Sequence, residues 1–205
     1  MTKVLYTIGH SNHLLEKFIE LLQDHGISAV ADVRSQPYSR YTPQFNREAL
    51  KSALKKQGIA YVFLGKELGA RSDDSKCYIN GKVQYELLAQ TELFRQGIIR
   101  LYKGMEDYNV TLMCAEADPL SCHRTILVCH SLRNSDLRIS HILPNSRLEE
   151  NTESERRLLR NLHISELDLF LTREESVERA YSLQGKRIAY TLQSNHAEIK
   201  GESYE

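Results

Sequence analysis

The sequence has no long hydrophobic run and only four cysteines. No apolar stretch approaches the roughly 20 residues that a transmembrane helix needs, and the N-terminal residues turn polar after about six, too soon for a secretory signal. We therefore expect a cytoplasmic protein without a membrane partner. Four cysteines in a chain of 205 residues favour reduced thiols over a disulfide framework.

Neither sign of charge is in excess. Lysine plus arginine and aspartate plus glutamate amount to 27 residues each, so only a local basic cleft could attract an anion such as nucleic acid. The phosphate-binding G-x-x-x-x-G-K-[ST] loop is absent, as are G-x-G-x-x-G, G-x-S-x-G and H-E-x-x-H. None of these motifs therefore indicates the activity.

What the sequence does contain is an alternation of short apolar runs with segments of helical spacing. Helices are predicted between strands that cover residues 3–8, 27–33, 59–64, 110–113 and 136–142. Because parallel neighbours need crossover connections, this alternation predicts a three-layer α/β/α fold with a mostly parallel sheet of about five strands.

The composition changes after Pro144, where the chain becomes charged and polar and has little apolar content. We therefore expect an α/β domain over residues 1–144. Residues 145–205 are expected to form a helical, partly flexible C-terminal extension that is peripheral to the domain.

Reactive residue types are concentrated in one stretch, Asn109 to Arg133. A short apolar strand there ends at Cys114, and an acidic loop with Pro119 leads into a helix. The thiols, acids, hydroxyl, imidazole and guanidinium of this loop belong to Cys114, Glu116, Asp118, Ser121, Cys122, His123 and Arg124.

Polar residues also follow the earlier strands at the points where these strands end. In parallel sheets ligands bind beyond the carboxyl ends of the strands. We therefore expect one cleft to be lined by groups from four separate turns. These groups are His10 and Ser11, Asp32 and Arg34, Lys66 to Arg71, and Cys114 and Glu116.

The residue types suggest roles in this cleft. Cys114, Glu116 and His10 are the catalytic candidates, because a thiol can act as a nucleophile and a carboxylate or imidazole as an acid or base. Guanidinium groups and helix amides hold phosphates and carboxylates; alternatively, the same arginines pair with acids and brace the loops. The candidate substrate-binding residues are Ser11, Asp32, Arg34, Arg40, Tyr61, Arg71, Cys122, His123 and Arg124.

A metal site would use Cys114, Cys122 and His123, with His10 as a further ligand. The spacing lacks the paired short Cys motifs of structural zinc sites, so we assign no metal ligand and keep a metal-dependent thiol site as an alternative. The loop from Cys114 to Arg124 also lacks the glycine needed for the tight amide cradle of cysteine phosphatases and rhodanese-like sulfurtransferases.

Five motifs stand in order along the chain. They are T-I-G-H-S-N at 7–12, D-V-R-S-x-P-Y-S-R at 32–40 with Phe45 after it, Y-V-F-L-G-K-E-L-G-A-R at 61–71, L-M-C-A-E-x-D-P-x-x-C-H-R at 112–124 and His141-Ile142. Together they resemble the domain of unknown function 488 family over about Lys3 to Leu143. The resemblance implies a bacterial or archaeal cytoplasmic α/β domain whose activity is not settled, with the residues at the strand ends as signature positions.

The favoured interpretation is an enzyme, a hydrolase or a transferase, that acts on a phosphate-bearing small molecule or nucleotide at the carboxyl edge of the sheet. The rival is a non-catalytic nucleic-acid or nucleotide binding module, in which the arginines act with Tyr38, Tyr41 and Tyr61. The expected partner is thus a small anionic ligand or nucleotide, with nucleic acid as the alternative. The sequence indicates neither a cofactor nor an oligomeric state.

Overall fold

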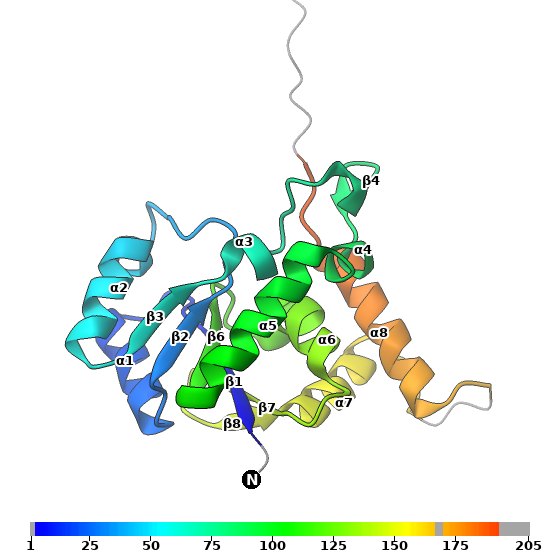
Figure 1. The fold of residues 1–205 in the computed structure, drawn as a ribbon. Helices are drawn as coiled ribbons and strands as arrows, with labels where there is room; N and C mark the ends of the chain where they lie inside the picture. Colours follow the sequence, from blue (N-terminus) through cyan, green and yellow to red (C-terminus); the bar gives the residue numbers. More distant parts are fainter. Residues whose placement is uncertain (1–2, 167–169, 193–205) are drawn as a thin grey trace, which may run out of the picture.

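The computed structural model describes residues 3–166 and 170–192, and its centre is a six-stranded sheet (Figure 1). The strand order is β3-β2-β6-β1-β7-β8; the first five strands run parallel, and β8 runs antiparallel to β7. This confirms the predicted α/β class and the mostly parallel sheet. The bounds are β1 Val4–Gly9, β2 Ala29–Asp32, β3 Ala60–Phe63, β6 Val110–Cys114, β7 Arg138–Ile142 and β8 Leu148–Glu150.

Helices cover both faces of the sheet because its central strands are apolar on both sides. On β2, Val30 packs into a smaller core while Ala29 and Ala31 pack into a larger one. On β6, Met113 packs into the smaller core and Leu112 into the larger one. The smaller core is covered by α1 (Leu15–Asp24) and α2 (Arg47–Lys56). The larger core is covered by α3 (Gly65–Leu68), α4 (Tyr85–Ala89), α5 (Glu92–Asp107), α6 (His130–Leu132), α7 (Asn151–Asn161) and α8 (Arg173–Ile188).

The parallel register brings the carboxyl ends of three strands to one level. Gly9 of β1 pairs with Cys114 of β6, and Asp32 of β2 pairs with Met113 of β6. Gly9 lets the loop after β6 approach, since a Cβ built on it would lie 1.8 Å from the carbonyl oxygen of Glu116. The turns that follow β1, β2 and β6 therefore lie side by side.

The C-terminal extension differs from its expected peripheral position. Its residues supply the edge strand β8, and α7 and α8 bury Leu158, Leu159, Val177 and Ala180 in the larger core. These few apolar residues suffice because they recur at helical spacing on one face of each helix. The prediction of a partly flexible extension includes residues 193–205, which lie outside the described residues.

Two local features were not predicted. A hairpin of β4 (Tyr78–Ile79) and β5 (Lys82–Val83) stands in the polar stretch after the third strand, and its turn residues Asn80 and Gly81 both have positive φ. The segment η4 (Arg124–Cys129), expected as the start of an α-helix, is wound as a π-helix. Within the two described ranges, no helix is both long enough and apolar enough to cross a membrane.

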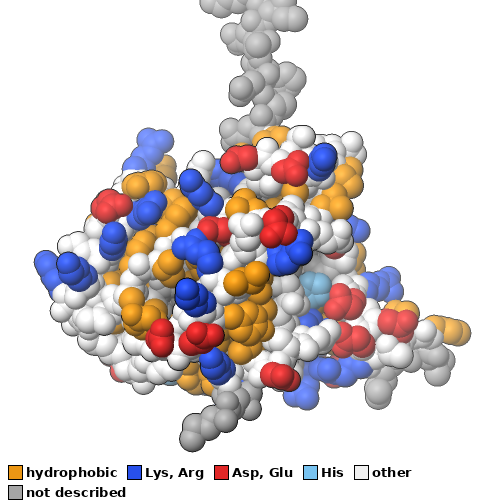
Figure 2. All heavy atoms as spheres, viewed as in Figure 1, with side chains coloured by type: hydrophobic (Ala, Val, Ile, Leu, Met, Phe, Trp, Pro, Cys, Tyr) orange, Lys and Arg blue, Asp and Glu red, His pale blue; other side chains and the backbone are white. Residues whose placement is uncertain are grey.

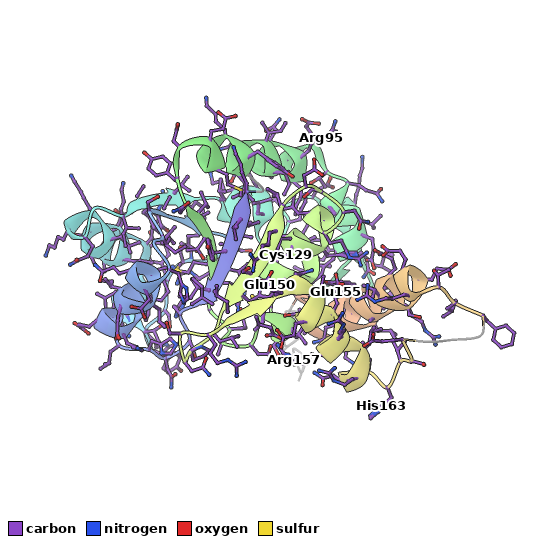
Figure 3. All side chains as sticks on the ribbon, turned by 90° about the horizontal axis from the view of Figure 1, so that it is seen from below. Arg95, Cys129, Glu150, Glu155, Arg157 and His163 are labelled. Atoms are coloured by element: carbon purple, nitrogen blue, oxygen red, sulfur yellow. The ribbon has the colours of Figure 1, made fainter. Side chains whose placement is uncertain are left out.

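A chain of buried polar groups joins β1, β7 and α7. The Thr7 hydroxyl donates to Nδ1 of His141 at 2.9 Å, and Nε2 of His141 donates to Asn151 at 3.2 Å. The Asn151 amide donates in turn to Glu155, which is labelled in Figure 3, at 3.1 Å. Burial and the nearby charge of Arg124 lower the pKa of His141 to about 3, so this imidazole is neutral in the folded protein.

We predict that His141 makes the protein less stable in acid. Its pKa is about 3 when folded and about 6.5 when unfolded. Between these values the unfolded chain binds a proton that the folded protein does not. The free energy of unfolding should therefore fall as pH drops through this window, by up to about 1.4 kcal/mol per pH unit from this group. Urea unfolding between about pH 7.5 and about pH 4.5 measures the slope.

The matched comparison uses two histidine variants. His141→Gln should show a shallower loss of stability with falling pH than the wild type, because it removes the proton-binding group. His163→Asn should keep the wild-type slope, because His163 is exposed and its positive φ of 55° suits asparagine. Identical slopes for the wild type and His141→Gln would contradict the prediction.

Candidate functional site

A cleft of about 320 Å³ lies beyond the carboxyl ends of β2 and β6, where α3, α4 and the end of α8 gather (Figure 1). We call it the rim cleft. Its walls come from the turns after β2 and β6, the chain after α3, the start of α4 and the end of α8. The lining residues are Arg34, Ser35, Gln36, Ala70, Arg71, Tyr85, Cys114, Ala115, Glu116, Ser121, His123, Ile188 and Tyr190.

The floor of the rim cleft adjoins a cluster of Cys114, Cys122 and His123, which we call the thiol–imidazole cluster. Its two sulfurs and Nδ1 of His123 lie within 4.8 Å of one another, and all three residues are buried. Nδ1 of His123 is 3.6 Å from Sγ of Cys114 and 4.0 Å from Sγ of Cys122. The three residues come together because Cys114 ends β6 and the loop returns the chain beside it.

The tautomer of His123 follows from its second ring nitrogen. Nε2 lies 2.9 Å from the carbonyl oxygen of Val33, which can only accept, so Nε2 carries the proton. In the neutral ring, Nδ1 then presents a lone pair to the two sulfurs. The backbone N–H of Arg124 also donates to Sγ of Cys122, at 3.5 Å.

The two thiols are electrostatically unequal. The hydrogen bond with Cys122 and complete burial raise the pKa of Cys114 well above its ordinary value. Burial would also raise the pKa of Cys122, but the hydrogen bond from Cys114 and the positive charge of Arg124 outweigh it, so this pKa lies well below its ordinary value. The contact of His123 with Cys122 raises the pKa of the imidazole against the opposing effect of burial.

Glu116 supplies a carboxyl group to the rim cleft. Partial removal of water and the negative charge of Cys122 raise its pKa. Glu116 thus lines the rim cleft and also lies near the thiols.

Arg34 borders the rim cleft, but its charge is largely matched. Its Nε and one terminal nitrogen donate to the two carboxylate oxygens of Asp32 at 2.9 and 2.7 Å. The same terminal nitrogen donates to the carbonyl of Phe45, and Tyr61 donates its hydroxyl to Asp32 at 2.8 Å. Asp32 and Tyr61 therefore stand behind Arg34 and brace it.

His10 has no free ring nitrogen. Its Nδ1 donates to the carbonyl of Ser11 at 2.8 Å, and its Nε2 accepts from Arg34 at 3.1 Å. The ring also stacks on Phe45 with centroids 4.3 Å apart. Burial and the charge of Arg34 lower its pKa to about 4. These contacts differ from those of a free general base, and neither His10 nor Ser11 lines the rim cleft.

The other predicted arginines occupy three different environments. Arg124 is fully buried and donates to Thr7 at 3.2 Å and to the carbonyls of Glu116 and Ala117 at 2.6 and 3.2 Å. Arg40 lies in an exposed loop away from the rim cleft, 5.7 Å from the ring of Tyr41. Arg71 is the exposed cation that lines the rim cleft.

The position of Arg71 depends on the C-terminal extension. Its guanidinium lies 4.1 Å from the centroid of the Tyr190 ring, an arrangement in which the aromatic face attracts the cation. Tyr190 is held by its carbonyl, which accepts from the backbone of Val83 in β5 at 2.9 Å. Sequence reasoning missed Tyr85, Ile188 and Tyr190, because nothing in the linear order brings the end of α8 to this edge.

The structure thus brings some of the predicted site residues together in one cleft. Arg34, Arg71, Cys114, Glu116 and His123 line one cleft, with Cys122 directly beneath it. The remaining candidates brace the wall or lie elsewhere, namely His10, Ser11, Asp32, Arg40, Tyr61 and Arg124. Figure 2 shows acidic and basic side chains interspersed on the molecular face that it presents, in keeping with the balanced composition.

Comparison with known proteins gives one match. A family model described as Domain of unknown function DUF488 matches residues 14–130, more than half of the chain. This range holds the turns after β2, β3 and β6, with the whole thiol–imidazole cluster. No curated protein and no solved structure matches the chain.

We predict that Arg124 is essential for stability. Arg124→Met should lower the free energy of unfolding by about 3 kcal/mol or more, since it leaves buried acceptors at Thr7, Glu116 and Ala117 without their donor. Arg40→Met, at an exposed arginine, should change it by less than about 0.5 kcal/mol. Urea unfolding of both variants checks this, and a loss below about 1 kcal/mol for Arg124→Met would show that the guanidinium is dispensable.

Proposed function

The chain belongs to the family described as Domain of unknown function DUF488, and from the geometry of its rim cleft we propose that it is an enzyme acting on a phosphate-bearing small molecule or nucleotide. One observation supports this above the others. A single cleft has an exposed guanidinium, that of Arg71, in its wall and reactive side chains, those of Cys114, Glu116 and His123, in its lining.

The size and place of the rim cleft suit a small molecule. Its volume of about 320 Å³ lies at the lower end of the range found for ligand sites. It opens beyond the carboxyl ends of parallel strands, where α/β sheets bind their ligands. A nucleotide or another small phosphate ester fits these dimensions better than a polymer does.

The charge of the cleft wall favours an anion. Arg34 is neutralised by Asp32 at 2.7 Å, whereas Arg71 has no carboxylate partner among the described ion pairs. A guanidinium fork that is held by stacking on an aromatic ring presents two parallel donors to a phosphate or carboxylate. Arg71 therefore has the role of the principal anion ligand, with the remaining N–H of Arg34 beside it.

The reacting groups line the same volume. Glu116 can accept a proton from, or deliver one to, a ligand that Arg71 holds, because both side chains border the cleft. The sulfur of Cys114 and the imidazole of His123 lie at its floor. Hydrolysis and group transfer both use such a combination of anion grip and proton carrier.

The first test concerns anion binding. In thermal-shift measurements with inorganic phosphate, nucleotides and sugar phosphates, at least one compound should raise the melting temperature of the wild type. Arg71→Gln should bind that compound at least about tenfold more weakly, since it loses the charge-assisted hydrogen bonds. Arg40→Gln is the matched control because Arg40 is also exposed and also lies over a tyrosine ring, and it should bind as the wild type does. A shift that is equal in the wild type and Arg71→Gln would refute the assigned grip.

The second test separates an enzyme from a binding module. With the compound found above, Glu116→Gln should bind with nearly unchanged affinity and should lose turnover by about a hundredfold or more, because the amide cannot transfer the proton. Mass spectrometry of the incubated compound follows product formation. If the wild type binds tightly but forms no product, the non-catalytic binding module is the better description.

A further inference from the structure

The thiol–imidazole cluster has the donor set of a metal site. Two sulfurs and one imidazole nitrogen are soft and borderline ligands of the kind that zinc and related divalent ions prefer. Seven residues separate Cys114 from Cys122, and His123 follows Cys122 directly. The three donors therefore come together only when the loop is folded. All three donors lie within 4.8 Å of one another and are buried.

The two sulfur–nitrogen separations are close to those of tetrahedral coordination. Zinc–sulfur bonds of about 2.3 Å and zinc–nitrogen bonds of about 2.05 Å, at tetrahedral angles, place a sulfur and a nitrogen about 3.6 Å apart. The observed distances from Nδ1 of His123 are 3.6 Å to Cys114 and 4.0 Å to Cys122. Both sulfur–nitrogen separations are therefore within a few tenths of an ångström of the tetrahedral value.

The surroundings orient the donors in the way that metal sites require. Metal-binding histidines usually donate their other ring nitrogen to a backbone carbonyl or a carboxylate. His123 does so to Val33 at 2.9 Å, which directs the Nδ1 lone pair at the sulfurs. The N–H of Arg124 donates to the Cys122 sulfur, and such a bond stabilises a thiolate.

One coordination position would face the rim cleft. Cys114 and His123 both line that cleft, while Cys122 lies behind them. A site with three protein ligands and one position open to a ligand volume has the arrangement of catalytic rather than structural zinc.

We propose that Cys114, Cys122 and His123 together bind one divalent metal ion of the zinc class, with its fourth position open to the rim cleft. The three ligands hold the ion at the floor, within reach of a molecule gripped by Arg71. As a Lewis acid, such an ion polarises an oxygen of a phosphate ester or holds a water molecule there. This role in catalysis rests on the proposed function, whereas binding of the ion does not.

The same contacts without an ion would form a hydrogen-bonded thiol pair, and oxidation of that pair would give a Cys114–Cys122 disulfide. These states and the metal site make different predictions. A metal site holds a stoichiometric ion and protects both thiols from alkylation. A bare pair holds no ion, and mass spectrometry detects either free thiols or a mass lower by two hydrogens.

The test uses the full chain purified without added metal or chelator. Elemental analysis should find about one zinc-class ion per chain. Replacement by cobalt(II) should give thiolate-to-cobalt charge-transfer absorption together with the intense d–d bands of a tetrahedral site. Cys114→Ser with Cys122→Ser should lose both signals, and Cys77→Ser, at a buried cysteine outside the cluster, should keep them.

The outcomes are separable from those of the anion screen. A wild type that holds no ion, takes up neither zinc nor cobalt(II) after reduction and shows no charge-transfer band overturns the metal site even if Arg71 binds a phosphate compound. A cobalt(II) spectrum in the wild type supports the site whether or not the cysteine variants fold. A protein that holds the metal ion but whose melting temperature is not changed by any anion tested supports the metal site and overturns the proposed substrate class.

Discussion

The buried guanidinium of Arg124 fixes the loop on which the candidate site depends. A charged group without water must satisfy its donors within the protein, and Arg124 does so with the hydroxyl of Thr7 and the carbonyls of Glu116 and Ala117. The loop after β6 is thereby held over the end of β1, where Gly9 leaves room for it. Cys122 lies between these anchored carbonyls and Arg124, so the same contacts bring its sulfur to Cys114.

The C-terminal helices complete this bracing. Arg157 of α7, labelled in Figure 3, donates to both carboxylate oxygens of Asp118 in the loop, at 3.0 and 2.8 Å. Gln184 of α8 donates to the carbonyl of Leu120 at 2.7 Å. Through Thr7 and His141 the hydrogen bonds of Arg124 also continue toward α7. The loop is thus held from the sheet side and from the helix side.

The sheet could be predicted from the sequence because buried parallel strands appear there as short apolar runs between turn residues. The sequence also predicted the edge of the sheet where Arg34, Cys114 and Glu116 lie. It could not separate the arginines, since burial and pairing are tertiary properties. Arg124 and Arg71 look alike in the sequence, yet one is enclosed by carbonyls and the other is exposed. The sequence suggests Cys114, Cys122 and His123 as one possible metal-ligand set, but their Cys-x7-Cys-His spacing becomes compact only because a short 3₁₀ turn, η3 (Pro119–Ser121), reverses the chain.

The pairing of Arg71 with Tyr190 has a kinetic consequence for how the site comes into being. The two residues lie far apart along the chain, and contacts of such separation are slow to form because a long loop must first be closed. Cys114, Glu116 and His123 precede β7 in the chain, whereas Tyr190 follows α8. The reactive floor of the rim cleft is therefore synthesised before the residue that completes its outer wall.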